Sequence, residues 1–233
     1  MNTKLLRILS RAVFFLGVIL GFALSVITIW NRLEGVRYYF TGAQYELFNG
    51  LRCPVMIAPN EKGIVTAVFN NPTDREDNFF YRAEISGDVT TRQVEGQIAV
   101  PAHQRKSIQL TVDANDVDLM FFIFVKMNIL PNALHRSQEA VCGMMIVNLL
   151  GLTGTQLSTV AFSLSFLGIA IGLVLLQKTG TNADQNIRRP MQALGLLVLL
   201  TMFAGLMGWW IAGLALSAIT ALLIVISIHL AIA

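Results

Sequence analysis

The stretch Ala12–Trp30, AVFFLGVILGFALSVITIW, runs for 19 residues without a charged side chain. As an α-helix rising about 1.5 Å per residue it would be roughly 28 Å long, close to the hydrocarbon thickness of a bilayer. Basic residues precede it, as in a cleaved signal peptide, but the apolar part of a signal peptide is shorter, roughly 7–15 residues. We therefore predict that this stretch is an uncleaved transmembrane anchor.

Three further apolar runs follow a polar middle region. They are Leu157–Leu176, Met191–Met207 and Trp209 to about Ala231, each near spanning length. Over the whole chain 55% of residues are hydrophobic and only 13% are charged, whereas a soluble domain carries about a quarter charged residues. The sequence therefore predicts an integral membrane protein with about four transmembrane helices and the lipid bilayer as a partner.

The basic residues beside these runs predict the orientation of the chain. They are Lys4, Arg7 and Arg11 before the first run and Lys178, Arg188 and Arg189 between the second and third. Because positive charge favours the cytoplasmic side, we expect both termini inside, at the plasma or cytoplasmic membrane. The same rule accounts for the net charge of +3 without a nucleic-acid partner. Aromatic residues then fall at the predicted outer interface, namely Trp30, Tyr38, Tyr39, Trp209 and Trp210.

The region between the first and second runs has the pattern of β-structure. Phe79–Ile85 and Ser107–Asp113 alternate apolar and polar residues, as strands with one wet face do. Turn-forming clusters separate seven candidate strands: Cys53–Ala58, Ile64–Asn70, Phe79–Ser86, Arg92–Val100, Lys106–Val112, Leu119–Met127 and Gln138–Val147. This number and spacing predict an immunoglobulin-like or fibronectin-like sandwich on the extracytoplasmic side, inserted between helices 1 and 2.

The predicted organisation has six segments. They are a cytoplasmic tip with the first helix (1–31), a membrane-proximal connector (32–52), the β-sandwich (53–148), the second helix (149–177), a cytoplasmic loop (178–190) and a hairpin of helices three and four (191–233). Within the sandwich, Leu119–Val125 (LMFFIFV) is apolar on both faces. We expect a central strand packed beneath a loop, and the alternative is a face that rests on lipid or on a partner.

The two cysteines are predicted to form a disulfide. Cys53 and Cys142 are 89 residues apart, and both belong to the segment expected on the oxidising side of the membrane. Closing a loop of that length contributes roughly 4–5 kcal/mol in the chain-entropy model, which is comparable to the whole stability of a small domain. Free thiols in redox or metal chemistry are the alternative, but the C-x-x-C spacing is absent.

Two acidic stretches are candidates for a calcium site. Asp74–Asp77 and Asp113–Asp118 resemble the D-R-E and D-x-N-D-N calcium motifs of cadherin repeats, which would imply an extracellular calcium-binding domain. Val117 replaces the second Asn of the latter motif, and the spacing is far shorter than in a cadherin repeat. We therefore predict solvated turn carboxylates, with calcium as the alternative. The candidate ligands are Asp74, Glu76, Asp113, Asp116 and Asp118.

No pattern in the sequence indicates catalysis. The chain lacks G-x-S-x-G, H-E-x-x-H and Walker-type motifs, and its histidines, His103, His135 and His229, are scattered. The four apolar runs contain no Asp, Glu, Lys or Arg, whereas ion-coupled carriers and voltage sensors need such groups within the membrane. We therefore expect neither an enzyme nor a transporter that works alone, and we expect no cofactor.

Small residues recur at helical spacing in the apolar runs. A small-xxx-small stripe lets two helix backbones approach closely, which favours association in lipid. The stripes could pack within one bundle, dock on another subunit or be coincidental. Their members are Gly17, Gly21 and Ser25, then Gly168 and Gly172, and then Gly213 and Ser217.

These features together predict a non-catalytic membrane subunit. Its helices would dock on other membrane protein subunits, in a homo- or hetero-oligomer, while the sandwich serves protein–protein interaction or complex assembly. One alternative is a pore component that uses hydroxyls such as Thr201 and Thr220, and another is a membrane enzyme acting on lipid or glycan. Gly50–Cys53 resembles the G-L-W-x-x-C motif of claudins, but Arg52 stands at the tryptophan position, and we do not assign that family.

Overall fold

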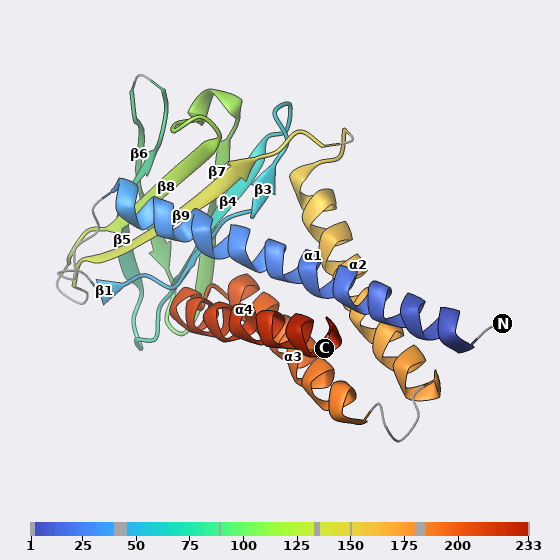
Figure 1. Cartoon of the computed structure of the whole chain (residues 1–233). Coiled ribbons are helices and arrows are strands. Elements are labelled where there is room, and N and C mark those ends of the chain that lie inside the picture. Colours follow the sequence, from blue (N-terminus) through green and yellow to red (C-terminus); the bar gives the residue numbers. More distant parts are fainter. Residues whose placement is uncertain are drawn as a thin grey trace. The chain divides into compact units, whose positions relative to one another are not determined.

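The computed structural model describes residues 3–39, 46–88, 90–132, 136–149, 151–179 and 185–232. The chain forms two compact units (Figure 1). The helical unit comprises Met1–Ile29 and Ser158–Ala233, and the β unit comprises Trp30–Leu157.

The described residues form four α-helices, which coincide with the four predicted apolar runs. They are α1 (Thr3–Tyr38), α2 (Gly154–Thr179), α3 (Gln185–Leu206) and α4 (Trp210–Ile232). Among the described residues, three helices are long and apolar enough to cross a membrane, and α4 contributes the shorter apolar stretch Ile211–Ile226. The first helix continues eight residues past Trp30. The first part of the predicted connector 32–52, residues 32–38, is therefore helical.

Within the helical unit, α1 and α2 cross at glycines. A β-carbon added to Gly17 would lie 2.8 Å from the backbone nitrogen of Ile169 and 2.9 Å from the carbonyl oxygen of Ser165. Likewise, a β-carbon on Gly172 would lie 2.7 Å from the Cα of Phe14. The two backbones are therefore in direct contact, and this contact requires residues without side chains at the crossing.

The β unit contains two sheets, formed from nine strands among the described residues. The six-stranded sheet has the order β1-β9-β8-β5-β6, with β3 also paired to β9, and the three-stranded sheet has the order β2-β4-β7. Both β1 and β3 run parallel to β9, and the other neighbours are antiparallel. The bounds are Glu46–Leu47, Leu51–Arg52, Met56–Ile57, Gly63–Asn70, Asp77–Ile85, Arg92–Val100, Arg105–Val112, Phe122–Ile129 and Gln138–Ile146 for β1 to β9, with the 3₁₀-helix η1 at Ala114–Asp116.

Each predicted strand has a counterpart, but two predictions need correction. In the predicted strand Cys53–Ala58 only Met56 and Ile57 pair, because this segment crosses from one sheet to the other. The strand predicted to begin at Leu119 begins instead at Phe122 as β8, because the preceding residues form a turn with left-handed backbone.

The two sheets share one hydrophobic core. Alternate residues of β4, including Val65 and Phe69, point into it, as do Ile123, Val125 and Met127 of β8. The predicted disulfide between Cys53 and Cys142 is confirmed, with the Cα atoms 6.4 Å apart. It joins β9 to the chain segment that crosses between the sheets.

The other face of the six-stranded sheet is covered by the last turns of α1 (Figure 1). A β-carbon on Gly143 of β9 would collide with the carbonyl oxygen of Asn31, and one on Gly35 would lie 3.0 Å from Val141. The ring of Tyr38 stacks on Phe124, with 4.7 Å between the ring centroids. This cover explains why β8 is apolar on both faces: one faces the core and the other faces α1.

We predict that Gly17→Ala destabilises the helical unit, whereas Gly213→Ala does not. The new methyl group at residue 17 would displace the backbone of α2, and overpacking of this kind costs about 1–3 kcal/mol. At Gly213 the nearest atom, in Ile29, lies at an ordinary 3.4 Å, and alanine is the better helix former. Thermal unfolding of both variants in detergent, followed by circular dichroism, tests the difference. Equal melting temperatures would contradict the crossing.

Candidate interaction site

The turn between η1 and β8, Leu119–Phe121, exposes three large apolar side chains. Their exposed fractions are 51% for Leu119, 91% for Met120 and 43% for Phe121. Leu119 and Met120 also have left-handed backbone, with φ of 46° and 71°. This conformation costs roughly 1–2 kcal/mol for a residue with a side chain. Strain of this kind concentrates at functional sites, so we call Leu119–Phe121 the apolar turn and treat it as the candidate site.

Asp118 holds the base of the apolar turn. Its backbone nitrogen donates to the carbonyl oxygen of Phe122 at 2.7 Å, and the Phe122 nitrogen donates back at 3.1 Å. The Asp118 carboxylate accepts a hydrogen bond from the Leu119 backbone nitrogen at 2.6 Å and from the Tyr38 hydroxyl at 2.5 Å. The last turn of α1 therefore fixes the base of the turn, while its apolar side chains remain exposed.

A series of aromatic rings lies beside the apolar turn. Phe121 contacts Phe122 with 4.6 Å between ring centroids, Phe122 stacks with Phe124 at 5.6 Å, and Phe124 stacks with Tyr38 at 4.7 Å. Contacts of this geometry stabilise by about 0.5–1.5 kcal/mol each beyond the area that they bury. The exposed turn is thus continuous with a rigid, buried base.

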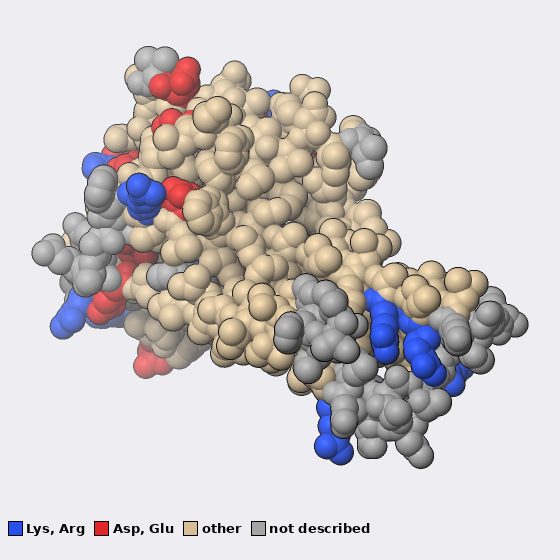
Figure 2. Space-filling model, in the orientation of Figure 1, with Lys and Arg blue, Asp and Glu red and all other residues tan. Residues whose placement is uncertain are grey.

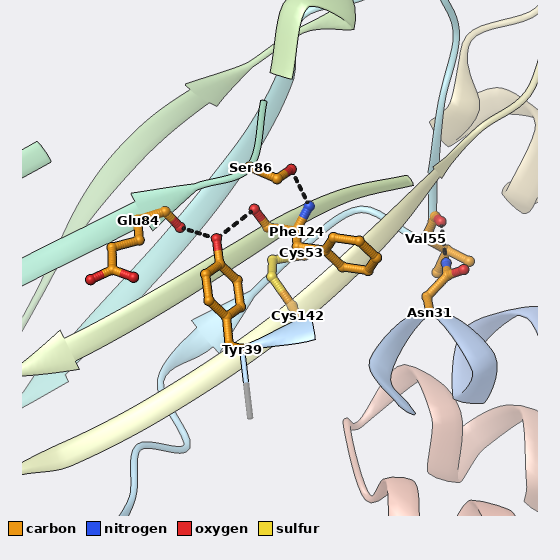
Figure 3. The surroundings of a disulfide bond; sticks show 8 residues. All are labelled: Asn31, Tyr39, Cys53, Val55, Glu84, Ser86, Phe124 and Cys142. Carbon is orange, nitrogen blue, oxygen red and sulfur yellow. Dashed lines mark hydrogen bonds between the residues drawn. A yellow bond between two sulfur atoms is a disulfide. The ribbon is translucent and has the colours of Figure 1, made fainter. Parts of the chain in front are cut away.

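Tyr39 and Ser86 complete this base (Figure 3). The Tyr39 hydroxyl donates to the carbonyl oxygen of Glu84 at 3.1 Å, beside the Phe124 carbonyl. The buried Ser86 hydroxyl accepts from the Phe124 backbone nitrogen and donates to the Asp116 carbonyl, both at 2.8 Å. Burial raises the pKa of Tyr39 well above its usual value. The nearby Tyr38 hydroxyl and the Glu84 and Asp118 carboxylates raise this pKa further. The phenol therefore stays protonated and hydrogen-bonded.

One charged pair between two strands of the sheet was not predicted from the sequence. Lys126 of β8 lies 3.5 Å from the Glu139 carboxylate of β9, and both side chains are largely buried. The Lys126 ammonium also lies over the Tyr39 ring, 5.6 Å from its centroid. This pair therefore links the neighbouring strands β8 and β9, where the Tyr39 ring covers it.

The five candidate calcium ligands are separated rather than gathered. Asp113 caps η1, the buried Asp116 pairs with Arg92 at 2.9 Å, and Asp118 binds Tyr38. Asp74 lies 2.8 Å from the His103 ring, and Glu76 is exposed at the same turn. Among the described residues, no three acidic, histidine or cysteine side chains form a group that could hold a metal ion.

The predicted small-residue stripes lie in the helical unit. Gly17, Gly168 and Gly172 form the crossing of α1 and α2, and a β-carbon on Gly21 would collide with the Ser165 hydroxyl. The Ser25 hydroxyl donates within its own helix, to the Gly21 carbonyl. In α4, Gly213 lies near Ile29, and Ser217 is buried.

The hydroxyls considered for a pore are used in helix packing. Thr201 and Thr220 donate to carbonyls of their own helices at 2.7 Å, and their hydroxyl oxygens lie 3.4 Å apart. Of the scattered histidines, His135 and the His229 side chain lie outside the described residues, as does part of the loop 178–190.

No protein-family model and no curated protein matches this chain. Among solved structures, a Paenibacillus sp. cycloisomaltooligosaccharide glucanotransferase complexed with cycloisomaltoheptaose is 12% identical, with a TM-score of 0.34, over 45% of this chain and 14% of that one. The β-glucosidase EmGH1 of Erythrobacter marinus is 11% identical, with a TM-score of 0.28, over 41% and 15% of the two chains. The chain thus matches only a small part of either enzyme, and likenesses this weak inform neither fold nor function.

We predict that Leu119→Asn combined with Met120→Gly raises the free energy of unfolding by about 1 kcal/mol. Asparagine and glycine adopt left-handed backbone with little strain, and the side chains they replace are exposed. Chemical unfolding of the full chain in detergent measures the change. Leu47→Asn, at another exposed leucine, is the matched control and should bring no gain. A loss of stability in the double variant would show that the turn serves the fold rather than a binding function.

Proposed function

We propose that this chain is a non-catalytic integral membrane subunit. Its helices anchor it and dock on other subunits, and its β unit makes a protein–protein contact through the apolar turn. The observation that carries this proposal is the combination at Leu119 and Met120 of strained backbone with exposed apolar side chains. In an isolated domain the strained backbone costs free energy and the exposed apolar side chains lower solubility. The free energy of binding offsets both when a partner covers the turn.

Insertion in a bilayer is supported by the surface of the helical unit. Large apolar side chains such as Leu16, Ile19 and Leu196 point outward from the helices, and three helices have spanning length. Exposed apolar surface costs about 25 cal/mol per Å² in water and nothing comparable in lipid. A lipid environment therefore accounts for this composition.

The charge distribution supports a cytoplasmic N-terminus. Figure 2 shows Lys and Arg side chains at the end of the helical unit where α1 begins. Arg7 and Arg11 of α1 and Lys178 in the last turn of α2 belong to the basic segments of the sequence. An excess of positive charge beside membrane helices favours the cytoplasmic side.

The strand order supports an immunoglobulin-like assignment for the β unit. One sheet holds β4 and β7, and the other has the order β9-β8-β5-β6, as strands B and E and strands G, F, C and C′ do in that fold. A short strand parallel to the last strand also fits. The disulfide differs, because it joins the last strand to the segment before β3 rather than the two sheets at B and F.

Native mass spectrometry after mild-detergent purification tests the proposed function. We expect the full chain to be recovered mainly in complexes, and we expect Leu119→Asn with Met120→Gly to reduce the complexed fraction. The Leu47→Asn control should leave that fraction unchanged. A lone protomer for the natural chain, across several detergents, would contradict the proposal.

A further inference from the structure

A second feature of the β unit complements the apolar turn. A cavity of about 390 Å³ opens beside the three-stranded sheet, a volume within the range of ligand pockets, roughly 300–1,000 Å³. Its apolar lining includes Pro54, Ile57 and the exposed Ile64. An apolar side chain such as that of Met120 would find in it the burial that it lacks in its own chain.

The charges of the cavity and of the turn are opposite. Arg52 and Lys62 line the cavity, and neither has an ion-pair partner among the described residues. Glu61 lines it too, and its carboxylate accepts from the backbone nitrogens of Ala58 at 2.9 Å and Gly154 at 2.6 Å, but one carboxylate does not balance two cations. The cavity therefore keeps a net positive charge.

The apolar turn is flanked by two carboxylates, Asp113 and Asp118, that form no ion pair with any described residue. Asp118 uses both oxygens on hydrogen bonds from Leu119 and Tyr38, which leave its negative charge uncompensated. Asp113 accepts a hydrogen bond from the backbone nitrogen of Asn115 and is partly exposed. Complementary charge at the rim of a contact guides association and fixes its register. The same carboxylates disfavour insertion of the turn into an anionic lipid surface.

The cavity and the turn lie at the same end of the β unit. At the end of β9, the Val147 nitrogen donates to the carbonyl oxygen of Ile57, which lines the cavity, at 3.0 Å. The Ile146 nitrogen donates to the carbonyl oxygen of Phe121, in the apolar turn, at 2.8 Å. The cavity and the apolar turn therefore both lie beside the end of β9. Copies anchored side by side in one membrane could each offer a turn to one neighbour and a cavity to the next, which is a heterologous contact.

We propose that the apolar turn of one copy inserts into this cavity of a second copy of the same chain. This inference rests on the proposed function and names the partner that the function requires. Leu119 and Met120 would fill the apolar part of the cavity, and Asp113 and Asp118 would face Arg52 and Lys62. The strain in the turn is then the cost of presenting these side chains to the neighbouring copy.

Site-specific photocrosslinking of the full chain in its membrane tests this inference. Benzoylphenylalanine replaces Met120 in cells that express two differently tagged copies, and irradiated products are purified through both tags. We expect an adduct of two chains whose crosslink maps to residues 52–66. The same probe at Leu47, which is also exposed, is the matched control and should yield no such adduct.

Cavity variants show whether the adduct depends on the proposed contact. Arg52→Glu with Lys62→Glu should lower the adduct yield by about tenfold or more, because the new carboxylates would face Asp113 and Asp118 of the other copy and repel them. Ile64→Lys, a single change at an exposed site, should lower it too. Unchanged yields in both variants, or a crosslink that maps elsewhere on the second copy, would overturn the inference.

The remaining outcomes separate this inference from the proposed function. A discrete adduct with a different protein would overturn self-association and leave the proposed function standing. If the probe reacts only with lipid or forms no adduct, and native mass spectrometry also finds a lone protomer, both the inference and the proposed function are overturned.

Discussion

The contact between the last turns of α1 and strand β9 is the constraint on which the β unit depends. At Gly143 the helix backbone lies so close that a β-carbon would collide with the Asn31 carbonyl, and Gly35 faces Val141 from the helix side. The Asn31 side chain adds a hydrogen bond to the Val55 carbonyl at 2.8 Å (Figure 3). Glycine at residue 143 is therefore required by packing, because only a residue without a side chain admits the helix.

This contact explains features that would otherwise conflict. It buries the face of the sheet opposite the core, so β8 can carry Phe122 and Phe124 on that face and Ile123 and Val125 on the other. It also brings Tyr38 to Asp118, which fixes the base of the apolar turn. The disulfide adds a covalent link between β9 and the segment that crosses to the second sheet. Rigid support and an exposed, strained turn are thus two results of one packing arrangement.

Much of this architecture could be predicted from the sequence, because periodicity and charge report on water exposure. The apolar runs predicted the four helices, the two cysteines predicted the disulfide, and alternating or apolar runs between turn clusters predicted β4 to β9 within a few residues. The extension of α1 to Tyr38 was missed because Arg32, Glu34 and Arg37 interrupt the apolar pattern, although they do not interrupt the helix. Tyr38 and Tyr39 pack on the sheet, which the sequence did not indicate, and their place at a membrane interface stays a prediction.

The site depends on information that local sequence patterns do not carry. Left-handed backbone is expected at glycine or asparagine, so Leu119 and Met120 were predicted as strand residues from their apolar character. The cavity is lined by residues of the stretch 52–66 together with Thr155 of α2, and no local pattern indicates that this stretch folds around a hollow. Asp118 was considered for calcium because sequence shows only that carboxylates are close along the chain, not that each already has a hydrogen-bond partner.

Native-state hydrogen exchange of the full chain in nanodiscs tests the central contact most directly. If the end of α1 and the sheet form one cooperative unit, the amides of 31–38 should exchange with the same opening free energy as those of β8 and β9. Gly143→Ala should then accelerate both groups together. Two results together would contradict the account. The amides of 31–38 would exchange rapidly, as in a frayed helix end, and β9 would stay protected both in the natural chain and in Gly143→Ala.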